Sequence, residues 1–160
     1  MALRVGIRPN RWRGGLYASQ SMIDPDLLRA FQETKFIVCT PQMEIVLRVM
    51  ERCSQLDQLM IASDAASCAF ITAWNPCSVR LLETVNHAKQ NQLIQEVQNR
   101  GFAFLHGRGV GEGSGWAPEP SILIIGIARE AAKELGRLFG QIAIVFAERG
   151  KTVELVSCRE

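Results

Sequence analysis

A chain of 160 residues, of which 48% are hydrophobic and 21% charged, has the size and composition of one globular domain that can bury a core without disulfide bonds. Its net charge of +2 is too small to indicate nucleic-acid binding by itself, and its longest apolar run, residues 122–128, is shorter than the ~20 residues of a membrane-spanning helix. Five cysteines without a C-x-x-C pair indicate neither a disulfide framework nor a zinc site, so we expect a soluble, cytoplasmic protein with no metal or other cofactor.

The first 23 residues differ in composition from the rest of the chain. They contain four arginines, two adjacent glycines and no acidic residue, so we expect residues 1–23 to form a basic, mobile arm and residues 24–160 to form a single domain. Pro9 and the glycines oppose the amphipathic helix that a mitochondrial presequence needs. Binding of the arm to phosphate groups is the alternative to a solvated terminus.

The first half of the domain combines helix-start signals with short apolar runs. The elements that these patterns predict are a helix at 24–34, strands at 36–39 and 44–49, a helix at 54–62 and a strand at 68–74. Asp24 followed by Pro25 is typical of a helix start, and Ser54 with Asp57 resembles a capping box. Residues 42–52 also fit a helical period, so a helix there is the competing interpretation.

The second half begins with the longest predicted helix. Asn75 or Ser78 is expected to cap it, with Pro76 in its first turn, and Gly101 ends it. The apolar positions expected to form its buried stripe are Leu82, Val85, Leu93 and Val97. The remaining elements are strands at 102–105 and 121–127, a helix at 129–139, and strands at 141–146 and 152–156. This order predicts an α+β fold, with one mixed sheet and helices packed mainly on one face.

A glycine-rich segment, residues 106–121, is the strongest candidate for a functional site. Six of the 13 glycines lie between Gly101 and Gly115, so the backbone there must turn sharply or approach another group closely. The spacing matches neither a dinucleotide-binding nor a Walker motif. Successive backbone N–H groups in such a loop can hold an anion, and a loose surface loop is the alternative.

Polar side chains gather on both flanks of this segment. His106 and Glu119 are the candidate catalytic acid and base, because they would share one sheet edge if their strands pair; structural hydrogen bonding is the alternative for both. The residues expected to bind a ligand are Asn75, Ser78, Asn86, Arg108, Gly109, Trp116, Ser121 and Gln141. Asn75 lies where a strand end presents ligand groups, and Arg108 can hold a phosphate or carboxylate. With two histidines and no nearby cluster of carboxylates, we expect no metal site.

Several of these residues occur in spaced motifs. In chain order the motifs are Phe70-Ile-Thr-Ala-Trp-Asn-Pro-x-Ser78, Asn86, Gly107-x-Gly109, Trp116-x-x-Glu119-x-Ser121 and Phe139-Gly-Gln141-x-Ala143. Over about residues 24–156 the chain resembles the uncharacterised bacterial family called domain of unknown function 3293. The resemblance implies a shared fold and site, and it implies no reaction.

Two classes of function remain open. In the first, the domain binds, or acts on, a polar small molecule, nucleotide-like or phosphorylated, at residues 106–121. In the second, it is a protein-interaction or regulatory module that docks a partner through Trp116. Clustered amides and charges favour the first class, whereas the lack of a complete catalytic motif favours the second. Nucleic-acid binding rests on the basic arm alone, and no pattern indicates an oligomeric state.

Overall fold

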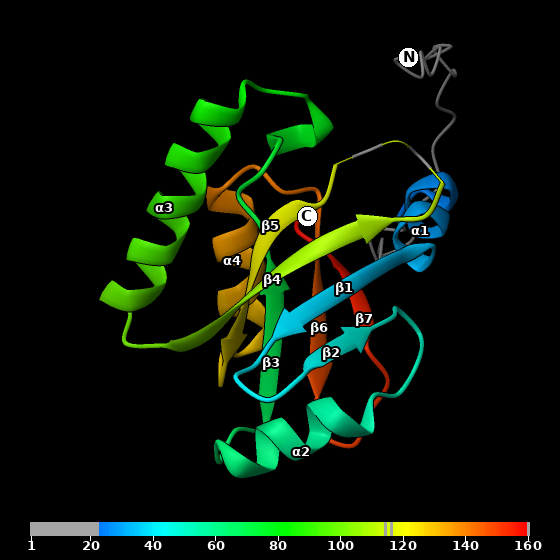
Figure 1. Ribbon diagram of the computed structural model, residues 1–160, viewed down its shortest axis with the longest axis vertical. Coiled ribbons are helices and arrows are strands. Elements are labelled where there is room, and N and C mark those ends of the chain that lie inside the picture. The colour runs from blue at the N-terminus through cyan, green and yellow to red at the C-terminus, as the bar shows by residue number, and fades with distance from the viewer. Residues whose placement is uncertain (1–22, 114, 116, 160) are drawn as a thin grey trace, which may run out of the picture.

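The computed structural model describes residues 23–113, 115 and 117–159 (Figure 1). Its elements, in chain order, are α1 (Pro25–Gln32), β1 (Thr34–Cys39), β2 (Glu44–Leu47), α2 (Ser54–Ala62), β3 (Ser67–Ile71), the 3-10 helix η1 (Pro76–Ser78), α3 (Glu83–Asn99), β4 (Ala103–Gly111), β5 (Glu119–Ile125), α4 (Arg129–Leu138), β6 (Ala143–Glu148) and β7 (Glu154–Ser157). This order confirms the α+β fold and the predicted succession of α-helices and strands. The proposed basic arm lies outside the described residues, apart from Ile23. Within the described part of the chain, every helix is too short or too polar to cross a membrane.

The strands of the described residues form one curled, seven-stranded sheet in the order β2-β1-β4-β5-β3-β6-β7. Each pairing among the described residues is antiparallel, whereas a mixed sheet was expected. The difference arises at β3, which lies between β5 and β6. These two strands run in the same direction and are joined through α4, but each of them pairs with β3 and not with the other.

The sheet has an apolar core on each face, because successive strand residues point to opposite sides. In β3, Phe70 packs on the face that α2 covers through Leu56 and Met60. Ile71 packs on the opposite face, where α3 and α4 contribute residues such as Leu93. The two longest helices therefore cover one face, and α2 closes one end of the other (Figure 1).

Two predicted helix starts have different outcomes. The Asp24 carboxylate caps α1, because its Oδ1 accepts a hydrogen bond from the Asp26 N–H at 2.8 Å. The predicted capping box at Ser54 is wrong: α2 begins after Cys53 and has no side-chain cap. The Asp57 carboxylate instead accepts a hydrogen bond from the distant Gly150 N–H at 2.8 Å, so a tertiary contact replaces the local one.

The glycine-rich segment is a β-hairpin and not a loop for most of its length. β4 continues through Gly107 and Gly109, six residues beyond its predicted end, and pairs with both β1 and β5. A Cβ atom on Gly107 would clash with the Ile37 carbonyl oxygen and would lie 2.8 Å from Cε2 of Phe70. The sequence suggested that the glycines allow either a sharp turn or a close approach of the backbone to another group. At Gly107 the reason is the close approach.

Candidate functional site

The chain makes a strained turn at residues 75–78, shortly after β3 ends at Ile71. Asn75, Cys77 and Ser78 all have left-handed backbone conformations, with φ values of 45°, 55° and 58°. Non-glycine residues in such conformations cost of order 1–3 kcal/mol each and persist where surrounding contacts hold them. The prediction that Asn75 or Ser78 caps the long helix is wrong, because α3 begins at Glu83 and neither side chain caps it.

Hydrogen bonds made by the backbone and the side chain of Asn75 hold this turn in place. Asn75 donates its backbone N–H to Asn86 Oδ1 at 2.9 Å, and Asn86 Nδ2 donates to Asn75 Oδ1 at 2.8 Å. The same Asn75 oxygen accepts a hydrogen bond from the Leu81 N–H at 3.0 Å, and Asn75 Nδ2 donates to Glu119 Oε1 at 2.9 Å. Asn75 and Asn86 are only 8% and 2% exposed. The fold thus brings together three of the residues singled out in the sequence.

Two further residues of this polar cluster were not anticipated. The Gln90 side chain is 5% exposed, and its Oε1 accepts a hydrogen bond from the Ala73 N–H at 2.9 Å. Thr72 Oγ1 donates to the Pro120 carbonyl oxygen at 2.7 Å and so ties β3 to β5. We call Thr72, Asn75, Asn86, Gln90 and Glu119 the polar cluster. Among the described residues, each buried polar side-chain atom has a partner.

The buried face of α3 explains why the sequence prediction was incomplete. This face consists of Asn86, Gln90, Leu93 and Val97, at the i, i+4, i+7 and i+11 spacing of one helical stripe. Leu82 and Val85, which were predicted to be part of the stripe, are 75% and 40% exposed. Gln90 continues the helical spacing of Leu93 and Val97, and this is the sequence signal that points to it. The apolar pattern instead indicated two positions that face solvent.

Two other predicted ligand-binding residues have structural hydrogen bonds beside the cluster. Ser121 is buried, and its hydroxyl donates to the Glu119 carbonyl oxygen at 3.0 Å. Gln141 Nε2 donates to the Trp74 carbonyl oxygen at 3.4 Å. Ser78 lies in the turn itself and is exposed. These contacts support the turn and the start of β5.

The structure does not bring His106 to Glu119. Glu119 is opposite Gly109 in the β4–β5 register, so His106 lies three strand positions away, or about 10 Å along the sheet. An odd separation also directs the two side chains to opposite faces. The exposed His106 ring instead contacts Phe104 edge-on, with centroids 5.4 Å apart. The predicted acid–base pair is therefore not formed.

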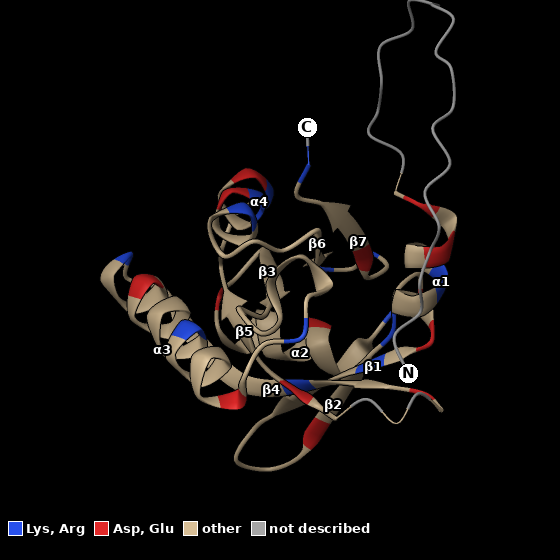
Figure 2. Ribbon diagram, turned by 90° about the horizontal axis from the view of Figure 1, so that it is seen from above, with Lys and Arg blue, Asp and Glu red and all other residues tan. Residues whose placement is uncertain are grey.

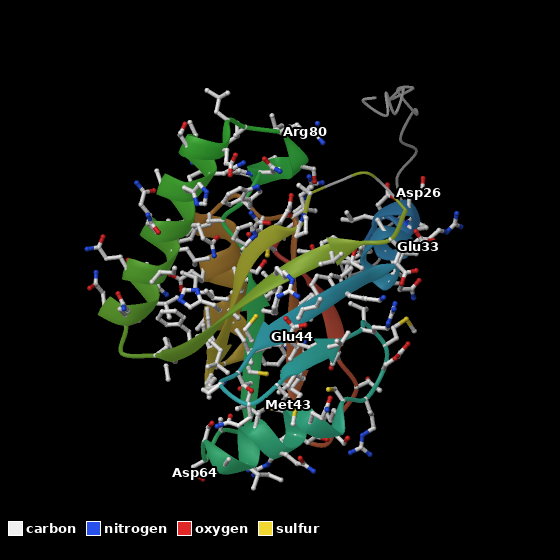
Figure 3. The ribbon with its side chains drawn as sticks, in the orientation of Figure 1. Asp26, Glu33, Met43, Glu44, Asp64 and Arg80 are labelled. Atoms are coloured by element: carbon white, nitrogen blue, oxygen red, sulfur yellow. The ribbon has the colours of Figure 1, made fainter. Side chains whose placement is uncertain are left out.

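Arg108 also lies away from the polar cluster. Its Nη2 donates to Glu44 Oε1 at 2.8 Å, and this hydrogen bond raises the pKa of the guanidinium above its usual value. Glu44, the partner of Arg108, lies on β2 and away from the turn (Figure 3). The turn is at the end of the molecule marked by Arg80, and Asp64 marks the opposite end. Gly109 is an internal strand residue of β4, and the predicted partner-binding Trp116 lies outside the described residues.

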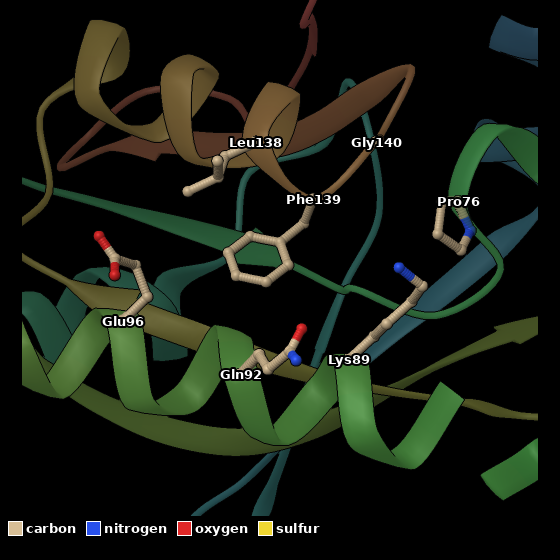
Figure 4. Close-up of a pocket in the computed structure, with 7 residues that line it drawn as sticks. All are labelled: Pro76, Lys89, Gln92, Glu96, Leu138, Phe139 and Gly140. Carbon is tan, nitrogen blue, oxygen red and sulfur yellow. The ribbon is translucent and has the colours of Figure 1, made fainter. Parts of the chain in front are cut away.

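A pocket of about 440 Å³ opens beside the turn, between α3 and α4 (Figure 4). Its lining residues are Pro76, Lys89, Gln92, Glu96, Leu138, Phe139 and Gly140. The turn is fixed to this pocket wall, because the Cys77 N–H donates to the Gly140 carbonyl oxygen at 2.8 Å. A Cβ atom on Gly140 would lie 2.8 Å from Cβ of Pro76, so the two segments are in close contact.

Charged groups around the site do not suggest a metal centre. Within the described residues, there is no group of three or more His, Cys, Asp or Glu side chains that could hold an ion. Figure 2 shows both basic and acidic residues on α3 and α4. The candidate site consists of three amides, one hydroxyl and one carboxylate beside a strained backbone.

The fold and this site define a single α+β domain with a curled antiparallel sheet and, at one end, the polar cluster, of which Asn75, Asn86 and Gln90 are buried. Within that class, residues 71–144 match the model of a family described as protein of unknown function (DUF3293). The match confirms the resemblance inferred from the motifs. It runs from the end of β3 into β6 and is shorter than the expected range, residues 24–156. No curated protein and no solved structure was found to match the chain.

Proposed function

We propose that this domain binds, or acts on, a small polar molecule, nucleotide-like or phosphorylated, in the cytoplasm, and that the ligand lies against the turn at residues 75–78. The observation that carries the proposal is the combination of a strained turn with the largely buried polar cluster that holds it. Residues in sparsely populated backbone conformations concentrate at ligand-binding and catalytic sites.

The composition of the polar cluster supports the same conclusion. Buried amides and carboxylates contribute little net stability compared with well-packed apolar side chains, so folding alone does not require Asn86 and Gln90 on the inner face of α3. The half-buried Glu119 carboxylate has one oxygen oriented by Asn75. Fixed amide and carboxylate groups of this kind orient polar ligands in otherwise apolar sites.

The proposed site differs in position from the one that the sequence suggested. The turn and the polar cluster replace the hairpin at 106–121 as its centre, and Glu119 is common to both. His106 and Arg108 are placed outside it, because each has contacts elsewhere on the sheet.

A thermal-shift screen of the full chain against nucleotides and phosphorylated metabolites tests the proposal. A ligand present at 100 times its Kd adds about 2.7 kcal/mol to the free energy of unfolding, which raises the Tm by roughly 5–10 °C for a domain of this size. Glu119→Gln should reduce the shift, whereas Glu112→Gln, which changes an exposed carboxylate in the hairpin, should not. The proposal fails if no compound raises the Tm, or if Glu119→Gln leaves the Tm shift at its wild-type size.

A further inference from the structure

The pocket between α3 and α4 has the dimensions of a small-molecule site. Its volume of about 440 Å³ falls within the roughly 300–1,000 Å³ of ligand pockets. Figure 4 shows polar side chains projecting from α3 on one side and Phe139 from the end of α4 on the other. The polar residues are Lys89, Gln92 and Glu96. One wall is therefore polar and the opposite wall apolar.

Lys89 supplies a positive charge to this pocket. It is half-buried, and the described residues offer it no hydrogen-bond or ion-pair partner. The other lysine in this region, Lys133 on α4, pairs with Glu130 at 3.5 Å. At the opposite end of the pocket, Glu96 pairs with Arg100, whose Nε lies 2.7 Å from the Glu96 carboxylate. Arg100 Nη2 also lies 3.8 Å from Glu134, so that end carries more negative than positive charge. The end near Lys89 is therefore the one suited to an anion.

The Phe139 ring supplies a flat apolar surface next to this charge. Figure 4 shows the ring projecting into the space between the helices, with Gln92 and Lys89 across from it. Aromatic rings prefer offset-stacked or edge-on neighbours, which contribute about 0.5–1.5 kcal/mol beyond the burial of area. A ligand that fills the pocket would thus place an aromatic group on Phe139 and an anionic group toward Lys89.

We propose that the pocket binds an aromatic anion, with its carboxylate or phosphate group at Lys89 and its ring against Phe139. Pro76 of the strained turn forms part of this pocket, so the pocket adjoins the site of the proposed function. The inference rests on that proposed function and names the class of its ligand. The Gln92 amide is placed to donate a further hydrogen bond to the anion.

Isothermal titration of the full chain with phenyl phosphate tests this assignment. We expect phenyl phosphate to bind, and inorganic phosphate and benzyl alcohol to bind at least about tenfold more weakly, since each lacks one of the two recognised groups. Lys89→Met should weaken phenyl phosphate binding about tenfold through the loss of a charge-assisted hydrogen bond, and Lys89→Arg should keep most of it. Lys133→Met, which removes a lysine outside the pocket, should leave it unchanged.

A second variant separates the ring from the charge. Phe139→Leu should weaken phenyl phosphate binding and leave inorganic phosphate binding unaltered. Wild-type affinity for phenyl phosphate in either Lys89→Met or Phe139→Leu, or no binding of phenyl phosphate to the wild-type chain, would overturn the inference. If other polar metabolites still raise the Tm of the wild-type chain, only this ligand class is wrong; if none does, the proposed function fails with it.

Discussion

Replacing Asn86 with alanine should lower the free energy of unfolding by about 2–3 kcal/mol. The substitution removes the acceptor of the buried Asn75 N–H, and an orphaned buried donor costs about 1–3 kcal/mol. It also removes the bond from Asn86 Nδ2 to Asn75 Oδ1, which is worth about 1 kcal/mol. The higher helix propensity of alanine offsets roughly 0.6 kcal/mol of this loss.

The matched control is Asn91→Ala, the same change at an exposed position of the same helix. It isolates helix propensity, so it should be neutral or slightly stabilising. Urea unfolding of both variants measures the difference in their free energies of unfolding, and the m-value should be unchanged. The Tm of Asn86→Ala should fall by roughly 5–10 °C. A loss smaller than about 0.5 kcal/mol relative to Asn91→Ala would refute the view that the polar cluster holds the turn.

Three further predictions concern packing and the thiols. Gly107→Ala should destabilise the fold by about 3 kcal/mol or prevent soluble expression through overpacking against β1, whereas Gly109→Ala, where the nearest atom to the added Cβ is 4.0 Å away, should melt close to wild type. Burial raises the pKa of the Cys68 thiol from 9.0 to about 12. The unfolded thiol therefore loses its proton near pH 9 while the folded thiol keeps it, so stability should fall as pH rises from about 9 to 12, by up to about 1.4 kcal/mol per pH unit for this group. Urea melts across that range check the slope, and an alkaline stability that does not fall would contradict it. In native protein a disulfide reagent should label the exposed Cys77 and leave Cys68 unmodified until unfolding.

Local signals in the sequence were sufficient for the succession of helices and strands. Asp24 caps α1 as expected, and Gly101 and Gly140 take the positive φ values, 80° and 70°, that follow the ends of α3 and α4. These features depend on a few neighbouring residues, so they can be predicted without knowledge of tertiary contacts.

The site depended on contacts that no local pattern contains. Asn75 and Pro76 have the residue types of a helix start, but the Asn75 carboxamide bonds to Asn86 and Glu119, which are 11 and 44 positions away. The glycines at 107–111 were predicted to form a loop, but they are residues of β4. The close packing of Phe70 against Gly107 supports this strand. In both cases long-range packing overrides local propensity, which is expected where a fold supports a functional site.

The most direct test of the proposed site is a map of backbone amide chemical shifts when a compound that raises the Tm is added to isotope-labelled protein. We predict that the largest changes occur at the turn and the adjoining pocket, including Asn75, Cys77, Lys89 and Gly140. Changes confined to the β4–β5 hairpin, or to the pocket of about 360 Å³ beside α2, would contradict binding at the strained turn.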